Sequence, residues 1–268
     1  MTSSEPHDRT RQVRELAAGS RLEGKVAVVT GGSRGIGLEI CRAFAAEGAS
    51  LVVASRKIDN CEAVAAELSH RYGVEVLPLA VNVSDWEQCD LLAASTYGHF
   101  GRADVLVNNA GMSPLYPSLG EVSEALFDKV IGVNLRGPFR LGALFGERMR
   151  AEGGGSIINV SSVEAKRPRS HALPYAAAKA GLEALTQGLA SALAPEVRVN
   201  TIRCGMFATD ISAAWGDPEA VDAIARANVP LGRPGEPEEA TAAAVFLASD
   251  DSGYCTGSSI TVDGGIML

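Results

Sequence analysis

The chain has 268 residues, 46% of them hydrophobic and 21% charged, which is typical of a globular protein with a full core. This length is at the upper end for a single α/β domain. The net charge of −8 argues against general nucleic-acid or membrane binding, and no apolar run approaches the roughly 18 residues that cross a bilayer.

The five cysteines and the N-terminus indicate where the protein works. The cysteines are scattered and form no C-x-x-C pair, which predicts a reducing compartment, no disulfide frame and no metal site. Residues 1–21 are polar and lack the apolar segment of a secretory signal, so we expect a flexible N-terminal arm. We therefore predict a cytoplasmic protein with one domain over residues 22–268.

The first elements form a strand, glycine loop, helix and strand. A β-branched run over Lys25–Thr30 predicts a buried strand, and the glycine-rich stretch Gly31–Gly37 follows it directly. A helix is expected over Leu38–Glu47 and a second strand over Ser50–Ala54. Backbone N–H groups in such a loop and the helix N-terminus can approach a pyrophosphate, which predicts a dinucleotide site. The alternative is a glycine-rich turn with no ligand.

Strands and helices continue to alternate along the chain. Further helices are expected over Ile58–Tyr72, Asp85–Gly98, Ser123–Arg150 (as one or two helices), Tyr175–Ala194 and Pro237–Ala248. Further strands are expected over Val74–Val83, Asp104–Val107, Ser156–Val160, Val197–Ile202 and Ser259–Val262. This alternation predicts a single-domain Rossmann fold of the α/β class, a doubly wound parallel seven-stranded sheet with helices on both faces. The irregular stretch 206–234 follows a strand end, where such sheets bind ligands, and we expect a lid there.

Tyr175 and Lys179 are four residues apart on an alanine-rich expected helix, so they share one face of it. A positive charge beside a phenol lowers its pKa from the ordinary value of about 10 and makes it a better acid. Such a pair also arises by chance on surface helices, and only its surroundings can decide between the two interpretations.

Three motifs are similar to those of the short-chain dehydrogenase/reductases, in the order in which that family has them. Thr30–Gly37 resembles the T-G-x-x-x-G-x-G cofactor loop, Asn108–Gly111 resembles the N-N-A-G element, and Tyr175–Lys179 matches Y-x-x-x-K. The resemblance covers about residues 22–268. It implies hydride transfer between a nicotinamide cofactor and a small-molecule ketone or secondary alcohol.

The resemblance also implies four catalytic residues. Tyr175 would donate the proton during reduction, and Lys179 would lower the pKa of that phenol and bind the nicotinamide ribose. Ser162 lies thirteen residues before Tyr175, as the family's serine does, and would hold the substrate oxygen; Ser161 is its neighbouring alternative. Asn134 matches the family's helix asparagine and would hold a water that relays protons to Lys179, or would simply cap a helix.

Residues between Ser162 and Tyr175 are tempting as well. His171 is four residues before Tyr175, but a loop histidine is more often solvated than catalytic. The charged run 164–169 is interpreted as a solvated rim that could also meet an anionic substrate.

The residues after the second strand favour NADP over NAD. An NAD site usually has a carboxylate there, whereas this chain has Ser55 and Arg56, with Arg34 in the glycine loop able to reach the same 2′-phosphate. The alternative is that both arginines are solvated surface cations. The expected cofactor-binding residues are Gly31, Ser33, Arg34, Gly35, Ile36, Gly37, Ser55, Arg56, Asn82, Val83, Asn109, Ala110, Gly111, Tyr175, Lys179, Gly205 and Thr209.

Two positions depart from the family pattern. Cys204 precedes Gly205 where the family often has Pro-Gly, which frees the backbone at that point. Asn82 stands where an aspartate is common, and we expect its amide to keep the adenine contact.

The substrate is left open by the sequence. A 3-oxoacyl thioester on acyl carrier protein is one candidate, with Arg148 and Arg150 as carrier contacts, although Ser191 stands where a basic residue would be expected. The alternative functions are a non-catalytic NADP-binding sensor or scaffold and an epimerase or dehydratase of a related extended fold, against which the glycine spacing argues. The resemblance implies a homo-oligomer, a dimer or a tetramer, paired through residues 134–150 and 175–194.

Overall fold

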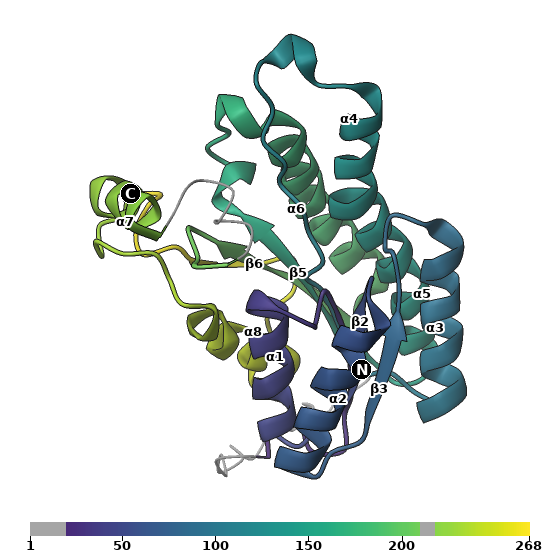
Figure 1. Ribbon diagram of the computed structural model, residues 1–268. Helices are drawn as coiled ribbons and strands as arrows, with labels where there is room; N and C mark the ends of the chain where they lie inside the picture. Colours follow the sequence, from purple (N-terminus) through teal and green to yellow (C-terminus); the bar gives the residue numbers. More distant parts are fainter. Residues whose placement is uncertain (1–19, 210–217) are drawn as a thin grey trace, which may run out of the picture.

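The computed structural model describes residues 20–209 and 218–268, which form a parallel sheet between two layers of helices (Figure 1). The seven strands lie in the order β3-β2-β1-β4-β5-β6-β7, and every neighbouring pair is parallel. The strands are β1 (Val26–Thr30), β2 (Ser50–Ser55), β3 (Val76–Ala80), β4 (Val105–Asn108), β5 (Gly155–Ser162), β6 (Val197–Cys204) and β7 (Ser259–Val262). The predicted doubly wound Rossmann sheet is confirmed.

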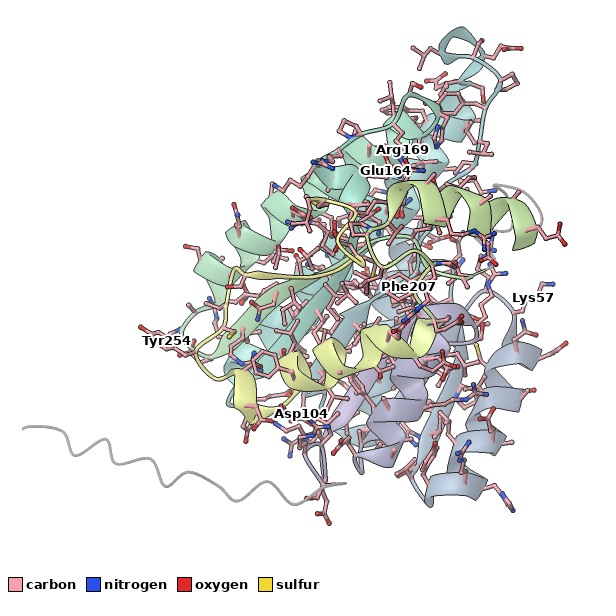
Figure 2. All side chains as sticks on the ribbon, turned by 90° about the vertical axis from the view of Figure 1, so that its left-hand side faces the viewer. Lys57, Asp104, Glu164, Arg169, Phe207 and Tyr254 are labelled. Carbon is pink, nitrogen blue, oxygen red and sulfur yellow. The ribbon has the colours of Figure 1, made fainter. Side chains whose placement is uncertain are left out.

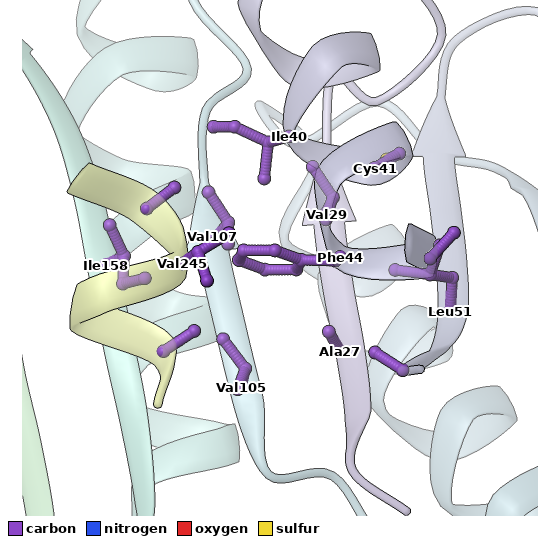
Figure 3. Close-up of a cluster of buried hydrophobic side chains, with 14 of the residues drawn as sticks. Ala27, Val29, Ile40, Cys41, Phe44, Leu51, Val105, Val107, Ile158 and Val245 are labelled. Atoms are coloured by element: carbon purple, nitrogen blue, oxygen red, sulfur yellow. The ribbon is translucent and has the colours of Figure 1, made fainter. Parts of the chain in front are cut away.

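Helices α1 (Gly35–Ala46), α2 (Ile58–Tyr72) and α8 (Thr241–Ala248) cover one face of the sheet. The other face is covered by α3 (Trp86–Phe100), α5 (Gly137–Ala151) and α6 (Leu173–Leu193). Each layer packs an apolar stripe on the sheet, as Figure 3 shows for the ring of Phe44, which lies among Val107, Ile158 and Val245. Full burial of such a side chain stabilises the fold by about 1.5–3 kcal/mol.

The stretch predicted as one or two helices over 123–150 contains two, joined by a wider turn. Ser123 caps α4 (Glu124–Ile131), because its Oγ accepts the Leu126 N–H at 3.2 Å. A single π-helical segment, Gly132–Arg136, then leads directly into α5. Such segments recur at functional sites in helices, and this one contains Asn134.

Four strands extend beyond their predicted C-terminal ends, β2 and β4 by one residue and β5 and β6 by two. β5 continues to Ser162 and β6 to Cys204, where the two residues pair with each other in the sheet. The run of apolar residues ends earlier, because β5 ends in two serines and β6 ends in Arg203 and Cys204. Ser162 is therefore held by a strand end, where little backbone freedom remains.

The predicted lid over 206–234 is only partly irregular. Residues 210–217 lie outside the described part of the chain, and α7 (Pro218–Asn228) follows them. α7 buries Val221, Ala225 and Val229 against Met206 in a small apolar cluster of its own. These four-residue spacings are a helical pattern, which the prediction missed among the alanines and prolines.

The predicted N-terminal arm ends in a fixed residue. Residues 1–19 lie outside the described part of the chain, but Arg21 donates to the Glu47 carboxylate at the end of α1 from both its backbone N–H and its guanidinium, each at 3.1 Å. Arg21 therefore belongs to the folded domain rather than to the arm. Short helical turns are formed by Leu119–Glu121, Val163–Ala165, Ser170–Ala172, Pro237–Ala240 and Asp250–Ser252.

Candidate active site

The carboxyl ends of the parallel strands meet along one edge of the sheet and form a cleft of about 800 Å³. All of the predicted cofactor-binding residues line this cleft, as do Ser162, Tyr175 and Lys179. Asn134 is not among the lining residues. A ligand-sized hollow at this edge is what the topology of an open α/β sheet predicts.

The glycine loop between β1 and α1 leaves its backbone open to close approach by a ligand. Gly31 and Gly35 have φ of 66° and 53°, a region that side chains other than glycine rarely adopt. A Cβ on Gly37 would lie 2.3 Å from both Asn109 Nδ2 and the Gly31 carbonyl oxygen. Only glycine therefore fits at position 37, and α1 begins at Gly35 in the lining of the cleft. This cradle fits the pyrophosphate of a dinucleotide.

Asn109 fastens this loop to the end of β4. Its side-chain Nδ2 donates to the Thr30 carbonyl oxygen at 2.9 Å and to that of Gly31 at 3.2 Å. In return, the N–H groups of Asn109 and Ala110 donate to Thr30 Oγ1 at 3.1 and 3.2 Å. The two motifs that the sequence singled out, the glycine loop and N-N-A-G, therefore hold each other in place.

The ends of β1 and β2 place the residues that were predicted to discriminate NADP from NAD. Ser33 Oγ donates to Ser55 Oγ at 2.9 Å, which fixes the glycine loop against β2. Arg34 and Arg56 are exposed and both line the cleft at this end. Asn60 and Lys57 also line it, and sequence reasoning did not single out Asn60.

Asn82 is folded into its own turn. Its Oδ1 accepts the Ser84 hydroxyl at 2.9 Å and the Ser84 N–H at 3.2 Å. These bonds occupy the amide oxygen, so only Nδ2 faces other partners. The expected adenine contact of Asn82 stays a prediction.

Tyr175 lies in the first turns of α6, where Pro174 suits the early helical position. Burial raises the pKa of Tyr175 to about 12, although a hydrogen bond with the Ser162 side chain acts in the opposite direction. The phenol is therefore protonated at neutral pH. The predicted Ser162–Tyr175 pair is brought together, at the end of β5 and the start of α6.

Lys179 does not act on Tyr175 in the way we predicted. It is 3% exposed, its Nζ lies 5.6 Å from the centre of the Tyr175 ring, and it donates to the Val160 carbonyl oxygen at 2.7 Å. Burial lowers the pKa of Lys179 to about 8, and the lysine is not among the causes that shift the phenol. The predicted lowering of the Tyr175 pKa is therefore wrong for the chain by itself, because burial dominates both groups.

Asn134 does not cap a helix, which removes one of its two interpretations. Its Nδ2 donates to the carbonyl oxygens of Val130 at 3.0 Å and Met112 at 2.9 Å, and its Oδ1 accepts the Met112 N–H at 3.3 Å. A Cβ on Gly111 would lie 3.1 Å from Asn134 Oδ1 and 3.8 Å from Lys179 Nζ, so the asparagine oxygen and the ammonium flank the same glycine. The proton relay through water stays a prediction.

Ser161 also lines the cleft, but its hydroxyl is bonded to a buried carboxylate. Its Oγ donates to the buried Glu183 carboxylate at 3.1 Å, and the same carboxylate accepts two bonds of 2.8 Å from the Arg203 guanidinium. Lys166 Nζ lies 3.2 Å from Glu183 as well. Burial alone would raise the pKa of Glu183, but these cationic and hydroxyl donors lower it. Sequence reasoning missed this cluster entirely.

Cys204 continues β6 where the family often has proline. Its thiol is buried, and burial raises its pKa to about 12, so it is a neutral neighbour of Lys179 rather than a thiolate. Gly205 follows it and donates its N–H to the Val262 carbonyl oxygen at 2.9 Å. A Cβ on Gly205 would lie 2.6 Å from Asp263 Cα, so the glycine is required by close packing against the segment after β7.

Several apolar side chains also line the cleft. Met112, Met206, Phe207 and Ile266 line it, and Phe207 is held by a backbone bridge to Gly235. Their residue types gave no signal in the sequence. Within the described residues, no helix is long and apolar enough to cross a membrane, and no three His, Cys, Asp or Glu side chains gather around a possible metal position.

Known proteins resemble this chain along almost its whole length. The family model described as enoyl-(acyl carrier protein) reductase matches residues 31–267. Dehydrogenase/reductase SDR family member 4 of Bos taurus is 37% identical over 252 residues, which cover 93% of this chain and 90% of that protein. The 3-oxoacyl-(acyl-carrier-protein) reductase of Thermotoga maritima is also 37% identical, and the match covers 92% of this chain and 100% of that protein.

A solved structure agrees with these relatives. L-sorbose reductase from Gluconobacter frateurii, crystallised with NADPH and L-sorbose, matches with a TM-score of 0.87 at 33% identity, over 94% of this chain and 99% of that one. A doubly wound sheet with a dinucleotide loop and a serine–tyrosine pair in one cleft defines an oxidoreductase of the nicotinamide class. The chain belongs to the short-chain dehydrogenase/reductase family.

Proposed function

We propose that the chain is an NADPH-dependent oxidoreductase that interconverts a ketone and a secondary alcohol. The single observation that carries this proposal is the Ser162–Tyr175 pair, which lies in the same cleft as the glycine loop. The two donors converge where a carbonyl oxygen would gain negative charge during reduction.

The chain's own residues fit the cofactor. The bare cradle at Gly37 suits a pyrophosphate, and Arg34 and Arg56 suit a 2′-phosphate because guanidinium groups match phosphate geometry. When bound, the nicotinamide supplies or accepts the hydride. The NADPH in the solved L-sorbose reductase supports the same cofactor for this chain.

Tyr175 carries the proton in this proposal. A phenol with a pKa of about 12 is protonated at neutral pH and is therefore in the form that donates to a reduced carbonyl oxygen. Ser162 donates to that oxygen too and holds it beside the phenol. Lys179 has a pKa of about 8, so its ammonium is mostly charged at neutral pH. It can donate hydrogen bonds to the ribose hydroxyls and help to pass a proton back to Tyr175 through water.

The 3-oxoacyl thioester and the acyl-carrier partner have weaker support. The name of the Thermotoga maritima relative favours this substrate. However, Arg148 lies 3.3 Å from the Glu152 carboxylate and Arg150 lies 2.8 Å from that of Glu147, so each expected carrier contact is already paired with an acidic neighbour. Assembly into a homo-oligomer through α5 and α6 stays a prediction that light scattering in solution would test.

The test of the proposal is NADPH oxidation over a panel of 3-oxoacyl thioesters, cyclic ketones and diketones, with Tyr175→Phe as the decisive variant. We expect kcat to fall by about 10²–10⁴ in Tyr175→Phe, the range for loss of a general acid, while NADPH binding persists. Full activity in the variant would overturn the assigned role. If the unaltered chain binds NADPH tightly but reduces nothing on the panel, the non-catalytic sensor becomes the better interpretation.

A further inference from the structure

An acidic and a basic residue form a pair in the cleft, close in sequence to Ser162. Glu164 and Arg169 both line the cleft and lie in the segment between β5 and α6. The Arg169 N–H donates to Glu164 Oε2 at 2.7 Å, and the guanidinium Nε lies 3.3 Å from Oε1 (Figure 2). The sequence-based interpretation of this run as a solvated rim is therefore wrong for Glu164, whose side chain is only 13% exposed.

Glu164 is held close to the reacting groups by its own backbone. Its N–H donates to Ser162 Oγ at 3.2 Å, so the two residues share one tight turn. The negative charge of Glu164 is felt at the phenol, because it adds to the effect of burial in raising the pKa of Tyr175. Glu164 thus lines the same cleft as Tyr175 and lies two residues from Ser162, which would hold the substrate oxygen.

The chemistry of the pair selects what such a group can be. A carboxylate only accepts hydrogen bonds, at about four lone-pair positions. The Arg169 N–H occupies one position on Oε2, and the Arg169 guanidinium forms an ion pair with Oε1. The remaining positions favour an O–H donor and repel a second carboxylate. The side chains of Met206, Phe207 and Ile266, which also line the cleft, offer a substrate hydroxyl no polar partner, whereas the Glu164 carboxylate can accept from it.

We propose that Glu164 determines specificity for ketones that carry a hydroxyl group on the carbon beside the carbonyl, and that Arg169 orients its carboxylate for this contact. The inference rests on the proposed ketone reduction and names its substrate class, a hydroxyketone of the ketose type. If Glu164 had only a structural role, it would hold the turn through Arg169, and its replacement would leave the relative kcat/KM values for different ketones unchanged.

The experiment compares three ketones with the unaltered chain, Glu164→Gln and a control variant. Erythrulose carries hydroxyls beside the carbonyl, 2,3-pentanedione carries none, and 4-oxopentanoate carries a carboxylate. Glu67→Gln is the matched control, because Glu67 also binds an arginine side chain, Arg42, at 2.8 Å, but lies outside the cleft. NADPH affinity and thermal unfolding are measured for each protein, so that a folding defect is recognised.

In Glu164→Gln, we expect the ratio of kcat/KM for erythrulose to that for 2,3-pentanedione to fall by about tenfold to a hundredfold, the effect of losing a hydrogen bond to a charged group. The ratio for 4-oxopentanoate to 2,3-pentanedione should rise, because a like charge is removed. Glu67→Gln should leave both ratios unchanged.

Unchanged ratios in a folded Glu164→Gln variant would overturn the inference. So would an unaltered chain that reduces 2,3-pentanedione but not erythrulose, an outcome that leaves the proposed ketone reduction intact. If the unaltered chain reduces none of the three ketones with NADPH, both the inference and the proposed function fail for these substrates.

Discussion

The buried ammonium of Lys179 donates a 2.7 Å hydrogen bond to the backbone carbonyl oxygen of Val160 and so ties α6 to β5. The bond satisfies one of three N–H donors, and the rest of the charge is desolvated. Burial lowers the pKa of Lys179 from 10.5 to about 8 for this reason. Because the folded, cofactor-free chain disfavours the charged form of Lys179, the free energy of unfolding should depend on pH.

We predict that the cofactor-free chain gains stability as the pH rises from about 8 toward 10.5 through Lys179. In this window the unfolded chain binds more protons than the folded chain, so the free energy of unfolding rises with pH. Below about pH 8 the lysine is charged in both states and its burial penalty is complete. Tyr175 acts oppositely above about pH 10, because its folded pKa is raised, so measurements should stop below that pH.

Denaturant unfolding at about pH 7.5 and about pH 9.5 checks this, with Lys179→Met as the comparison. We expect the unaltered chain to gain on the order of 2 kcal/mol more than the variant between the two conditions. Parallel pH dependence in the two proteins would mean that Lys179 does not titrate in this window.

A second prediction concerns Gly37. The alanine Cβ would lie 2.3 Å from Asn109 Nδ2 and from the Gly31 carbonyl oxygen, and backbone atoms cannot yield to it cheaply. Gly37→Ala should cost about 1–3 kcal/mol of stability and weaken NADPH binding more than tenfold. Gly98→Ala is the control: Gly98 is exposed on α3 with nothing within 4 Å of its Cβ position, and alanine there should stabilise the helix by about 0.5–1 kcal/mol. Fluorescence titration with NADPH and thermal unfolding would measure both effects.

Most of the architecture was predictable, because strand and helix periodicities are local. Bounds of α2 and β7 were predicted to the residue, and the glycine loop was found with its neighbouring strands. α7 was missed although Val221, Ala225 and Val229 have helical spacing, since the surrounding alanines, glycines and prolines obscured it.

The energetics of the site were less predictable than its residues. Motif spacing indicated Ser162, Tyr175 and Lys179, but desolvation depends on how strands and helices pack, which spacing does not contain. The Glu183–Arg203 pair could not be predicted for the same reason, because Arg203 lies twenty residues away on another element and no sequence pattern links the two. The roles of Arg34 and Arg56 stay predictions.

The cofactor preference is tested by Arg56→Asp. A carboxylate at this end of the cleft would repel a 2′-phosphate and accept a ribose hydroxyl, as NAD sites do. We expect the ratio of kcat/KM for NADPH to that for NADH to fall at least tenfold, the size of one lost charge-assisted hydrogen bond. Arg71→Asp in the last turn of α2 makes the same charge change outside the cleft and should leave the ratio unaltered. An unaltered ratio in Arg56→Asp would refute the NADP assignment.

The last prediction concerns the Glu183–Arg203 pair, which joins α6 to β6 directly beyond Lys179. Both guanidinium bonds to the carboxylate are 2.8 Å long, and Glu183 is buried. Removing one partner of such a pair leaves an uncompensated buried charge, so Glu183→Ala should cost about 3–5 kcal/mol of stability. Glu67→Ala breaks the more exposed Arg42 pair and should cost only about 0–1 kcal/mol.

The pH dependence of unfolding separates this charge effect from a packing defect. The pKa of Glu183 is lowered in the fold, so its contribution is complete above its ordinary value of 4.5 and is lost as the pH falls through the folded value. The gap in stability between the unaltered chain and Glu183→Ala should therefore narrow in acid. Replacing both partners, as in Glu183→Met with Arg203→Met, should recover much of the loss, because no unpaired charge remains buried. A gap that stays constant at low pH, together with no recovery in the double variant, would show that Glu183 stabilises α6 by packing rather than by charge.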